Sequence, residues 1–298
     1  MFDVITFGSA VIDIFVDTDV SEKKNFISYP VGSKILIKDL KFDIGGGGTN
    51  TAVAFARLGL KTGYIGKLGR DENAYEVLRL LKKEHIKFLG TQEGITGHSI
   101  ILDSKGGERT ILTYKGANDN LELKDINLKK VKTKWLYYSS LLEKSFEAQK
   151  RLAEILTKKN VKLAFNPSEY LIKEKNLSSL LKITEILILN KDEAKLLTKE
   201  NDLFLGLQRL GPKIIVITDK DKLIESYDSY SNKKYFLKPH KIKVVERTGA
   251  GDAFASGFVA GQIVGKTIPE SLGLGLKESE SVIRYFGAKN NLLRIRLR

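Results

Sequence analysis

Short apolar runs alternate with amphipathic stretches along most of the chain. The runs end in glycine or polar residues, which is typical of strands buried in a sheet, whereas the amphipathic stretches repeat apolar residues at helical spacing. Because alternating strands and helices require crossover connections, the pattern predicts an α/β fold with a mainly parallel central sheet. The expected strands lie at 3–9, 62–68, 86–89, 135–138, 162–165, 183–189 and 213–218, with antiparallel additions at 222–227 and 234–237. The expected helices lie at 51–58, 71–83, 145–159, 191–197, 253–264 and 268–286.

Two segments interrupt this alternation with strands but no helix. One is a β-like stretch at 34–42, and the other is a hairpin at 97–114 whose turn is expected at 105–107. We predict a small β-sheet lid, formed by segments about 14–42 and 97–114, inserted in a single domain that spans 1–298. Such a lid would exclude water from a reaction site beneath it. The apolar face of a small sheet must be shielded from water, so a homodimer that forms through the lid is one possibility.

The composition is that of an ordinary globular protein, with 42% hydrophobic and 29% charged residues in 298. The sequence has no apolar run of about 18 residues, which predicts no membrane span. It begins directly in a strand-like pattern rather than in a signal peptide, and it contains no cysteine. We therefore expect a cytoplasmic protein without a membrane partner.

The formal net charge of +14 raises the possibility of a nucleic-acid partner. The lysines, however, are spread along the whole chain, and no helix-turn-helix, zinc-finger or aromatic RNA-binding motif accompanies them. We expect a solvated basic surface and no nucleic-acid site. A positive field of this kind would attract phosphorylated small molecules.

A glycine-rich turn precedes the apolar helix expected at 253–264. Gly249, Ala250 and Gly251 would aim free backbone N–H groups at the space in front of that helix, where a phosphate is favoured. Asp252 follows them directly and could take a proton from an attacking hydroxyl. The alternative is that Asp252 only caps the helix.

A second glycine run precedes the helix expected at 51–58. Gly45 and Gly46 belong to a run of four glycines that permits close approach of a ligand to the backbone, and Asn50 can both donate to and accept from a polyol. Neither the GxGxxG nor the Walker pattern is present. Asp13 lies in an apolar run just beyond the first strand, where ligand hydroxyls bind in open α/β sheets, although a turn or edge-strand aspartate is the alternative.

Two polar residues follow the apolar strand expected at 183–189. Asn190 and Glu193 have the spacing of a capping box at the start of the next helix. In the functional interpretation, Glu193 lies near a hydrated Mg²⁺ that bridges nucleotide phosphates. The three histidines in the sequence lack metal-ligand spacing.

Together these motifs resemble the PfkB, or ribokinase-like, family of carbohydrate and nucleoside kinases. The resemblance covers nearly the whole chain, because GGGGTNTA at 45–52, NKDE at 190–193 and TGAGDAFASGF at 248–258 occur in the family's order and rough spacing. It implies a ribokinase-like, Rossmann-like, three-layer α/β/α fold with a β-sheet lid. It also implies an ATP-dependent kinase of a sugar hydroxyl that uses Mg²⁺.

The resemblance implies a role for each motif. Asp252 resembles the catalytic base, and the amides of Gly249, Ala250 and Gly251 resemble the anion hole for the γ-phosphate. Asn190 and Glu193 match the phosphate and Mg²⁺ motif. The expected sugar-binding residues are Asp13, Gly45, Gly46 and Asn50, and the expected nucleotide-binding residues are Asn190, Thr218, Lys220, Thr248, Gly249 and Gly251.

Several residues depart from the family pattern. Lys220 and Leu223 stand where the family usually has glycines. Lys277-Glu278 stands where the family has small residues that border the adenine. The identity of the nucleotide therefore remains an open question. Glu246 and Arg247 stand where Asp and Thr are common in the family, so whether this loop binds a monovalent cation is an open question. The motifs are also compatible with a nucleoside kinase, with a non-catalytic sensor of the same fold, and with a phosphosugar kinase whose second phosphate meets Lys38, Lys41 or Arg109.

Overall fold

A nine-stranded sheet forms the centre of the protein in a computed structural model that describes residues 1–298 except 19, 21–25, 106–108, 221 and 298. The strand order is β15-β14-β13-β12-β11-β10-β1-β4-β6. Strands β1 to β13 of this sheet pair in parallel, and β14 and β15 add antiparallel strands at one edge. The strands are β1 Phe2–Phe7, β4 Thr62–Ile65, β6 Lys87–Phe88, β10 Thr133–Ser139, β11 Lys162–Asn166, β12 Ile186–Asn190, β13 Ile214–Thr218, β14 Ile224–Asp228 and β15 Lys233–Leu237.

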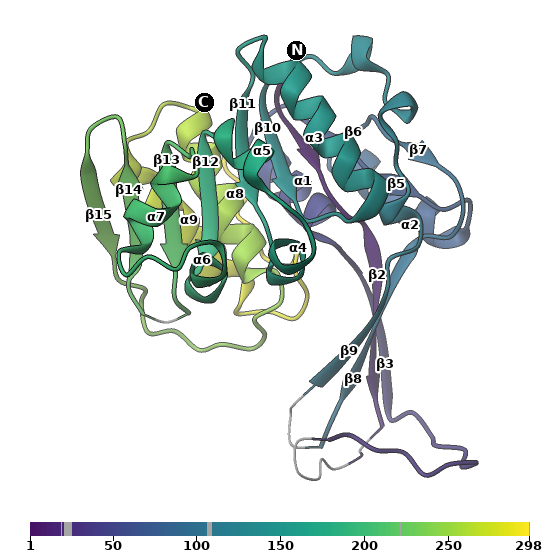
Figure 1. The fold of residues 1–298 in the computed structure, drawn as a ribbon. Coiled ribbons are helices and arrows are strands. Elements are labelled where there is room, and N and C mark those ends of the chain that lie inside the picture. The colour runs from purple at the N-terminus through teal and green to yellow at the C-terminus, as the bar shows by residue number, and fades with distance from the viewer. Residues whose placement is uncertain (19, 21–25, 106–108, 221, 298) are drawn as a thin grey trace.

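Helices cover both faces of this sheet, as Figure 1 shows. One face packs against α3 to α7 and the other against α8, α9 and part of α1, so the predicted three-layer α/β/α fold is confirmed. The helices are α1 Gly47–Arg57, α2 Glu72–Lys83, α3 Glu143–Thr157, α4 Glu169–Glu174, α5 Ser178–Lys182, α6 Lys191–Leu197, α7 Leu203–Arg209, α8 Ala250–Ile263 and α9 Ile268–Val282. Short 3₁₀ turns lie at Gly116–Asp119, Leu123–Asp125 and Leu128–Lys130. Of the helices described, none is both long and apolar enough to cross a membrane.

Side chains that alternate between the two faces of a strand contribute to the hydrophobic cores on both sides of the central sheet. In β10, Leu136 and Tyr138 face the α3 side, while Trp135 and Tyr137 face the α8 side. Burying both faces of a strand explains its continuous apolar run. Helix α8 is buried almost all round, and a Cβ on Gly257 would lie 2.8 Å from the Cα of Gly275 in α9. Small residues therefore let these two helices pack closely.

A second sheet of four strands projects from the body (Figure 1), and we call it the lid after the role predicted for it. Its order is β3-β2-β8-β9, in which β2 and β8 pair in parallel and the outer pairs are antiparallel. The lid strands are β2 Val11–Asp17, β3 Asp39–Gly45, β8 Gly97–Asp103 and β9 Arg109–Tyr114. Strands β5 Lys67–Leu68 and β7 Thr91–Gln92 form a separate two-stranded parallel sheet.

Several predicted boundaries were wrong. The strand expected at 34–42 begins at Asp39 and continues to Gly45, because all seven residues pair with β2. Helix α1 begins at Gly47 rather than at residue 51, α3 covers 143–157 rather than 145–159, and α9 ends at Val282 rather than at 286. The hairpin turn expected at 105–107 lies partly outside the described residues.

Candidate active site

The predicted base lies in the first turn of α8. That helix begins at Ala250, and its N-cap, Gly249, has a φ of 78°. A Cβ at Gly249 would lie 2.6 Å from the Cβ of Ala288, so both the left-handed backbone and the packing favour glycine there. The turn therefore places the Asp252 carboxylate beside a helix N-terminus, as the sequence predicts.

The three amides of this turn are not equivalent. The N–H of Ala250 donates to the carbonyl of Arg247 at 3.2 Å. Within the described part of the chain, no backbone carbonyl accepts a hydrogen bond from the amides of Gly249 and Gly251. A Cβ at Gly251 would have nothing within 4 Å, so open space lies in front of this residue. Two free donors and an open space are what an anion at a helix N-terminus requires.

The glycine run brings a second helix N-terminus to the same place. Gly46 is the N-cap of α1 with a φ of 95°, and a Cβ there would lie 2.5 Å from the carbonyl oxygen of Ser9. A Cβ at Gly48 would lie 2.5 Å from the carbonyl carbon of Gly8, at the end of β1. A Cβ at Gly47 would lie 3.4 Å from Oδ1 of Asp252. The missing side chains thus let α1 press against β1 and bring its first turn to the base.

Asn50 and Asp252 are joined directly. Asn50 is 6% exposed and lies in the first turn of α1, and its Nδ2 donates to Oδ2 of Asp252 at 2.8 Å. Burial raises the pKa of Asp252, while this hydrogen bond and the charge of Lys289 oppose the rise. The predicted acceptor-binding amide therefore also contacts the predicted base.

Asp13 lies on the lid rather than on the main sheet. In β2 it pairs in register with Asp43 of β3 and with Ser99 of β8. Burial raises its pKa to about 6, against the lowering effects of Lys289 and of a hydrogen bond from Ser99. A Cβ on Gly45 would lie only 2.0 Å from Oδ2 of Asp13, so this glycine makes the room that the carboxylate occupies.

A pocket of about 210 Å³ connects Asp252 with the ends of the central strands. Glu193 lines it, and its carboxylate accepts from the N–H of Asn190 at 2.8 Å in the predicted capping box. Burial raises the pKa of Glu193. The capping and metal interpretations are thus compatible, because the same side chain also faces the pocket. The other lining residues are Ser9, Gly47, Ser139, Ser140, Asn166, Ser168 and Tyr170.

The sequence reasoning missed most of this pocket. Ser139 and Asn166 are the last residues of the parallel strands β10 and β11. The carboxyl ends of parallel strands are where ligands bind, so the strand prediction held a usable signal. Ser139 Oγ is buried and has no partner among the described atoms.

The expected nucleotide residues lie at the ends of the next two strands. Asn190 and Thr218 pair in register between β12 and β13, and Thr218 Oγ1 donates to the carbonyl of Leu189 at 3.4 Å. Lys220 is exposed and has a φ of 49°. This left-handed backbone explains physically why glycine suits that position better than lysine does.

Glu246 ties the loop before α8 to the lid. Its Oε1 accepts from Arg109 Nη1 at 2.8 Å and also from the hydroxyl of Thr248, while Oε2 accepts from the N–H of Gly287 at 3.1 Å. Burial acts to raise the pKa of Glu246, but these three donors outweigh it and lower the pKa. Both oxygens of the carboxylate are therefore already engaged.

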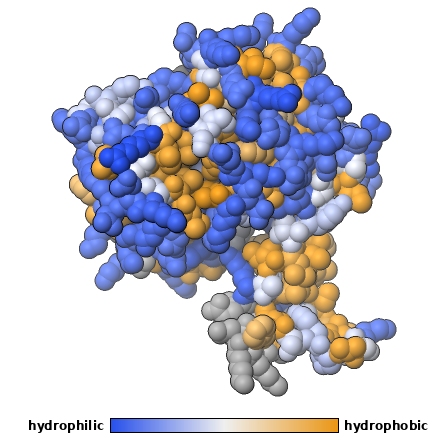
Figure 2. Space-filling view, in the orientation of Figure 1, coloured by the Kyte–Doolittle hydropathy of each residue, from blue (hydrophilic) through white to orange (hydrophobic). Residues whose placement is uncertain are grey.

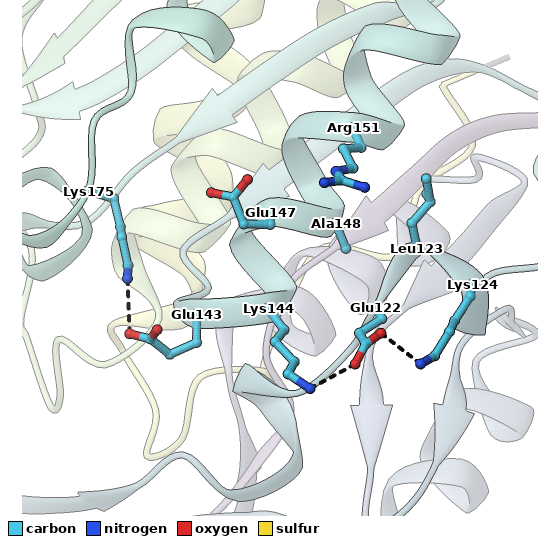
Figure 3. Close-up of a pocket in the computed structure, with 9 residues that line it drawn as sticks. All are labelled: Glu122, Leu123, Lys124, Glu143, Lys144, Glu147, Ala148, Arg151 and Lys175. Atoms are coloured by element: carbon cyan, nitrogen blue, oxygen red, sulfur yellow. Dashed lines mark hydrogen bonds and ion pairs between the residues drawn. The ribbon is translucent and has the colours of Figure 1, made fainter.

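A larger hollow, of about 630 Å³, lies away from these residues. Figure 3 shows that its charges pair with one another: Lys124 and Lys144 both contact Glu122, and Lys175 contacts Glu143. None of the predicted site residues lines it. Among the residues that the structure describes, no three His, Cys, Asp or Glu side chains are grouped to hold a metal.

Comparison with solved structures first identifies the class of protein. The chain superposes on the ribokinase of Thermotoga maritima with a TM-score of 0.84 and 22% identity, over 98% of this chain and 96% of that one. A ribokinase of Arabidopsis thaliana complexed with ribose and ATP gives a TM-score of 0.81 and 20% identity, over 98% and 96% of the two chains. The fold is therefore ribokinase-like.

Sequence comparison then shows the family. An uncharacterized sugar kinase of Archaeoglobus fulgidus is 29% identical, over 81% of this chain and 99% of that protein. The family model described as pfkB family carbohydrate kinase matches residues 1–295. The chain belongs to the pfkB family of carbohydrate kinases, as its motifs predict. It is accordingly a phosphotransferase with an alcohol group as acceptor.

Proposed function

We propose that this protein transfers the γ-phosphate of ATP to a hydroxyl group of a sugar, in the manner of ribokinases and fructokinases. The observation that carries the proposal is the arrangement around Asp252. This carboxylate lies in the first turn of α8, beside the free amides of Gly249 and Gly251 and within hydrogen-bond distance of Asn50. A base, an anion-binding turn and a hydroxyl-binding amide are the parts that phosphoryl transfer needs.

The acceptor would lie between the lid and the α1 N-terminus. Asp13 and Asn50 would bind its hydroxyl groups. Gly45 and Gly46, the other predicted sugar-binding residues, would act by making room for the Asp13 carboxylate and for Ser9, respectively. Asp252 would take the proton from the attacking hydroxyl, and its raised pKa brings it nearer to working pH. The amides of Gly249 and Gly251 would bind the negative charge of the phosphoryl group, with that of Ala250 turned back toward Arg247.

Glu193 is the residue that we propose to hold Mg²⁺. Its carboxylate faces the pocket that Asp252 also lines, and serine hydroxyls and Asn166 supply further oxygen atoms there. This donor set fits a hydrated Mg²⁺, which keeps several waters and needs only one or two carboxylates. A bound Mg²⁺ would neutralise part of the charge of the nucleotide phosphates.

The nucleotide would extend from this pocket over the ends of β12 and β13. Asn190, Thr218, Lys220 and Thr248 are the side chains that we propose for its phosphates and ribose. Lys220 is exposed and can reach an anion, although its left-handed backbone is strained. We also propose a cytoplasmic location, because ATP is supplied there.

The candidate acceptors differ in what they require of the lid. A phosphosugar would need cations for its second phosphate, but Arg109 contacts Glu246 and Lys41 contacts Asp39 at 2.5 Å. These pairs favour a neutral sugar, and a nucleoside remains the second candidate because the same hydroxyl-binding residues would serve its ribose. The basic surface is proposed to be solvated rather than bound to nucleic acid.

A coupled assay of ADP release tests the function directly. Mg-ATP is offered with ribose, fructose, fructose phosphates, adenosine and other nucleosides. Turnover with a sugar supports the proposal, and a preference for a nucleoside or a phosphosugar replaces its acceptor. Ligand binding without phosphate transfer in folded protein would favour a non-catalytic sensor and contradict the proposal.

We further propose that two chains associate through the lid. Apolar side chains gather on the lid, as Figure 2 shows, and they stay exposed in a single chain. Phe42, Ile100, Leu112 and Tyr114 lie on one face of the lid by strand register, and their exposed fractions are 64%, 38%, 53% and 55%. A second copy would bury this surface. Light scattering tests this: wild type should be a dimer and Phe42→Lys a monomer, whereas a monomeric wild type contradicts the proposal.

A further inference from the structure

Lys289 is a buried lysine in the segment after α9, which the sequence presents only as part of a basic tail. Its side chain is 5% exposed, and its ammonium donates to the carbonyl of Ile44 and to Oδ1 of Asn50. Three aspartates surround it electrostatically: Asp43, Asp13 and Asp252, from β3, β2 and α8. A single buried cation thus lies among the residues of the proposed acceptor site.

The main chain of Lys289 is held firmly in place. Arg57 Nη1 donates to its carbonyl at 2.6 Å, and Arg57 itself binds Oε1 of the buried Glu84 at 2.6 Å. Arg294 binds the same oxygen of Glu84 at 2.9 Å. The side chain therefore enters the site from an anchored backbone.

We propose that Lys289 is a positioning residue of the transfer site, which fixes the amide of Asn50 toward Asp252 and keeps the neighbouring carboxylates ionised. The inference rests on the proposed kinase function. A lysine ammonium can only donate, so Oδ1 of Asn50 must face Lys289. Nδ2 of Asn50 must then face Asp252, which accepts from it at 2.8 Å. Without Lys289 only the carboxylate of Asp252 would hold the amide in this orientation.

The charge of Lys289 acts on the base as well as on the amide. Its charge opposes the rise that burial causes in the pKa of both Asp13 and Asp252. Burial in turn lowers the pKa of Lys289 to about 8, with Asp43, Asp13 and Asp252 opposing that change and Arg57 adding to it. The ammonium is therefore charged at neutral pH and loses its proton in the mildly alkaline range.

The first test compares Lys289→Met with Lys67→Met. Lys67 is a matched control because it is 6% exposed, binds Glu93 at 2.6 Å, and does not line the pocket of Asp252. We expect Lys289→Met to lower kcat at least about tenfold and to move the acidic limb of the pH–rate profile up by roughly one unit, because the carboxylates lose their counter-charge. Lys67→Met should leave that limb in place.

Chemical rescue separates the hydrogen-bond donors of Lys289 from its charge. Lys289→Ala should regain turnover with added propylammonium, which restores the N–H donors. Tetramethylammonium should not rescue, because it carries charge without donors. A Lys289→Met enzyme with kcat within twofold of wild type and an unmoved acidic limb would overturn the proposal. So would equal rescue by both cations.

A measurement on wild type needs neither turnover nor a folded Lys289 variant. Carbon-13 NMR can follow the carboxyl signals of Asp13 and Asp252, assigned with Asp13→Asn and Asp252→Asn. We expect both signals to shift a second time near pH 8, when Lys289 loses its proton. Absence of that step between pH 7 and 9 contradicts the inference about Lys289, whereas an inactive enzyme that shows the step contradicts only the kinase function.

Discussion

Asn50 donates a hydrogen bond of 2.8 Å to Asp252, from a residue 202 positions earlier in the chain. The contact joins the first turns of α1 and α8, the two helices that begin in glycine-rich turns. The acceptor-binding motif and the transfer motif therefore form one site. This relationship makes Asp252 the first residue to change.

Asp252→Asn should abolish most turnover without unfolding the protein. Removal of a general base costs about 10²–10⁴-fold in rate. Burial raises the pKa of Asp252, so the folded state at neutral pH holds an unfavourable charge that asparagine lacks. We expect kcat to fall at least about a hundredfold and the melting temperature at pH 8 to stay the same or rise. Full turnover under saturating substrates would show that another group takes the proton.

Gly251 and Gly249 should respond differently to alanine. A Cβ at Gly251 meets open space, so Gly251→Ala should preserve folding but obstruct the phosphate, raising the KM for ATP or lowering kcat. Gly249 has a φ of 78°, and a Cβ there would clash with Ala288. Gly249→Ala should therefore cost about 1–3 kcal/mol of unfolding free energy. Urea unfolding and steady-state kinetics on both variants check this. Equal loss of stability in both would contradict the assignment of open space to Gly251.

The order of strands and helices, and the helix start beside Asp252, could be predicted because each depends on local periodicity and turn chemistry. Lys289 could not, because its burial depends on a contact with Asn50, 239 positions away, which no local pattern reveals. The pair between Arg109 and Glu246 spans 137 positions and is equally invisible locally. Helix α1 starts early because Gly47 packs against Ser139 of β10 and Gly48 packs against Gly8, just after β1, where side chains would clash.

Lys220 allows strain and charge to be tested separately. Its φ of 49° costs a non-glycine residue about 1–2 kcal/mol, and Lys220→Gly removes this strain. Glycine also raises the entropy of the unfolded chain, which offsets part of the gain. We expect Lys220→Gly to be as stable as wild type or up to about 1 kcal/mol more stable. Lys220→Met keeps the strain but removes the charge, and it should raise the KM for ATP several-fold. The matched control is Lys222→Met, which removes an exposed lysine 3.7 Å from Asp219. An unchanged KM in Lys220→Met would remove Lys220 from the nucleotide site.

Acceptor binding should weaken in mild acid because of Asp13. Burial raises its pKa to about 6, so the carboxylate that accepts from a sugar hydroxyl is lost as the pH falls through 6. We expect the KM for the acceptor to rise below pH 6 and Asp13→Asn to remove that dependence. The stability effect has the opposite direction: a raised carboxyl pKa stabilises the fold at low pH, and this is lost as the pH rises from about 4 to 6. Asp13→Asn should therefore stabilise the fold at pH 8 but not at pH 4. Stabilisation at pH 4 but not at pH 8 would contradict a raised pKa for Asp13.

Turnover should not depend on added potassium. A monovalent cation in the loop before α8 would need free oxygen ligands, yet Glu246 accepts from Arg109, Thr248 and the N–H of Gly287. The guanidinium of Arg109 thus already supplies a positive charge there. Replacing potassium with tetramethylammonium at constant ionic strength should change kcat less than about twofold, since only screening remains. Arg109→Met should lower kcat, because it frees Glu246 and unties β9 from the loop that carries the anion-binding amides. Strong activation of wild type by potassium, but not by tetramethylammonium, would show that a cation binds despite these contacts.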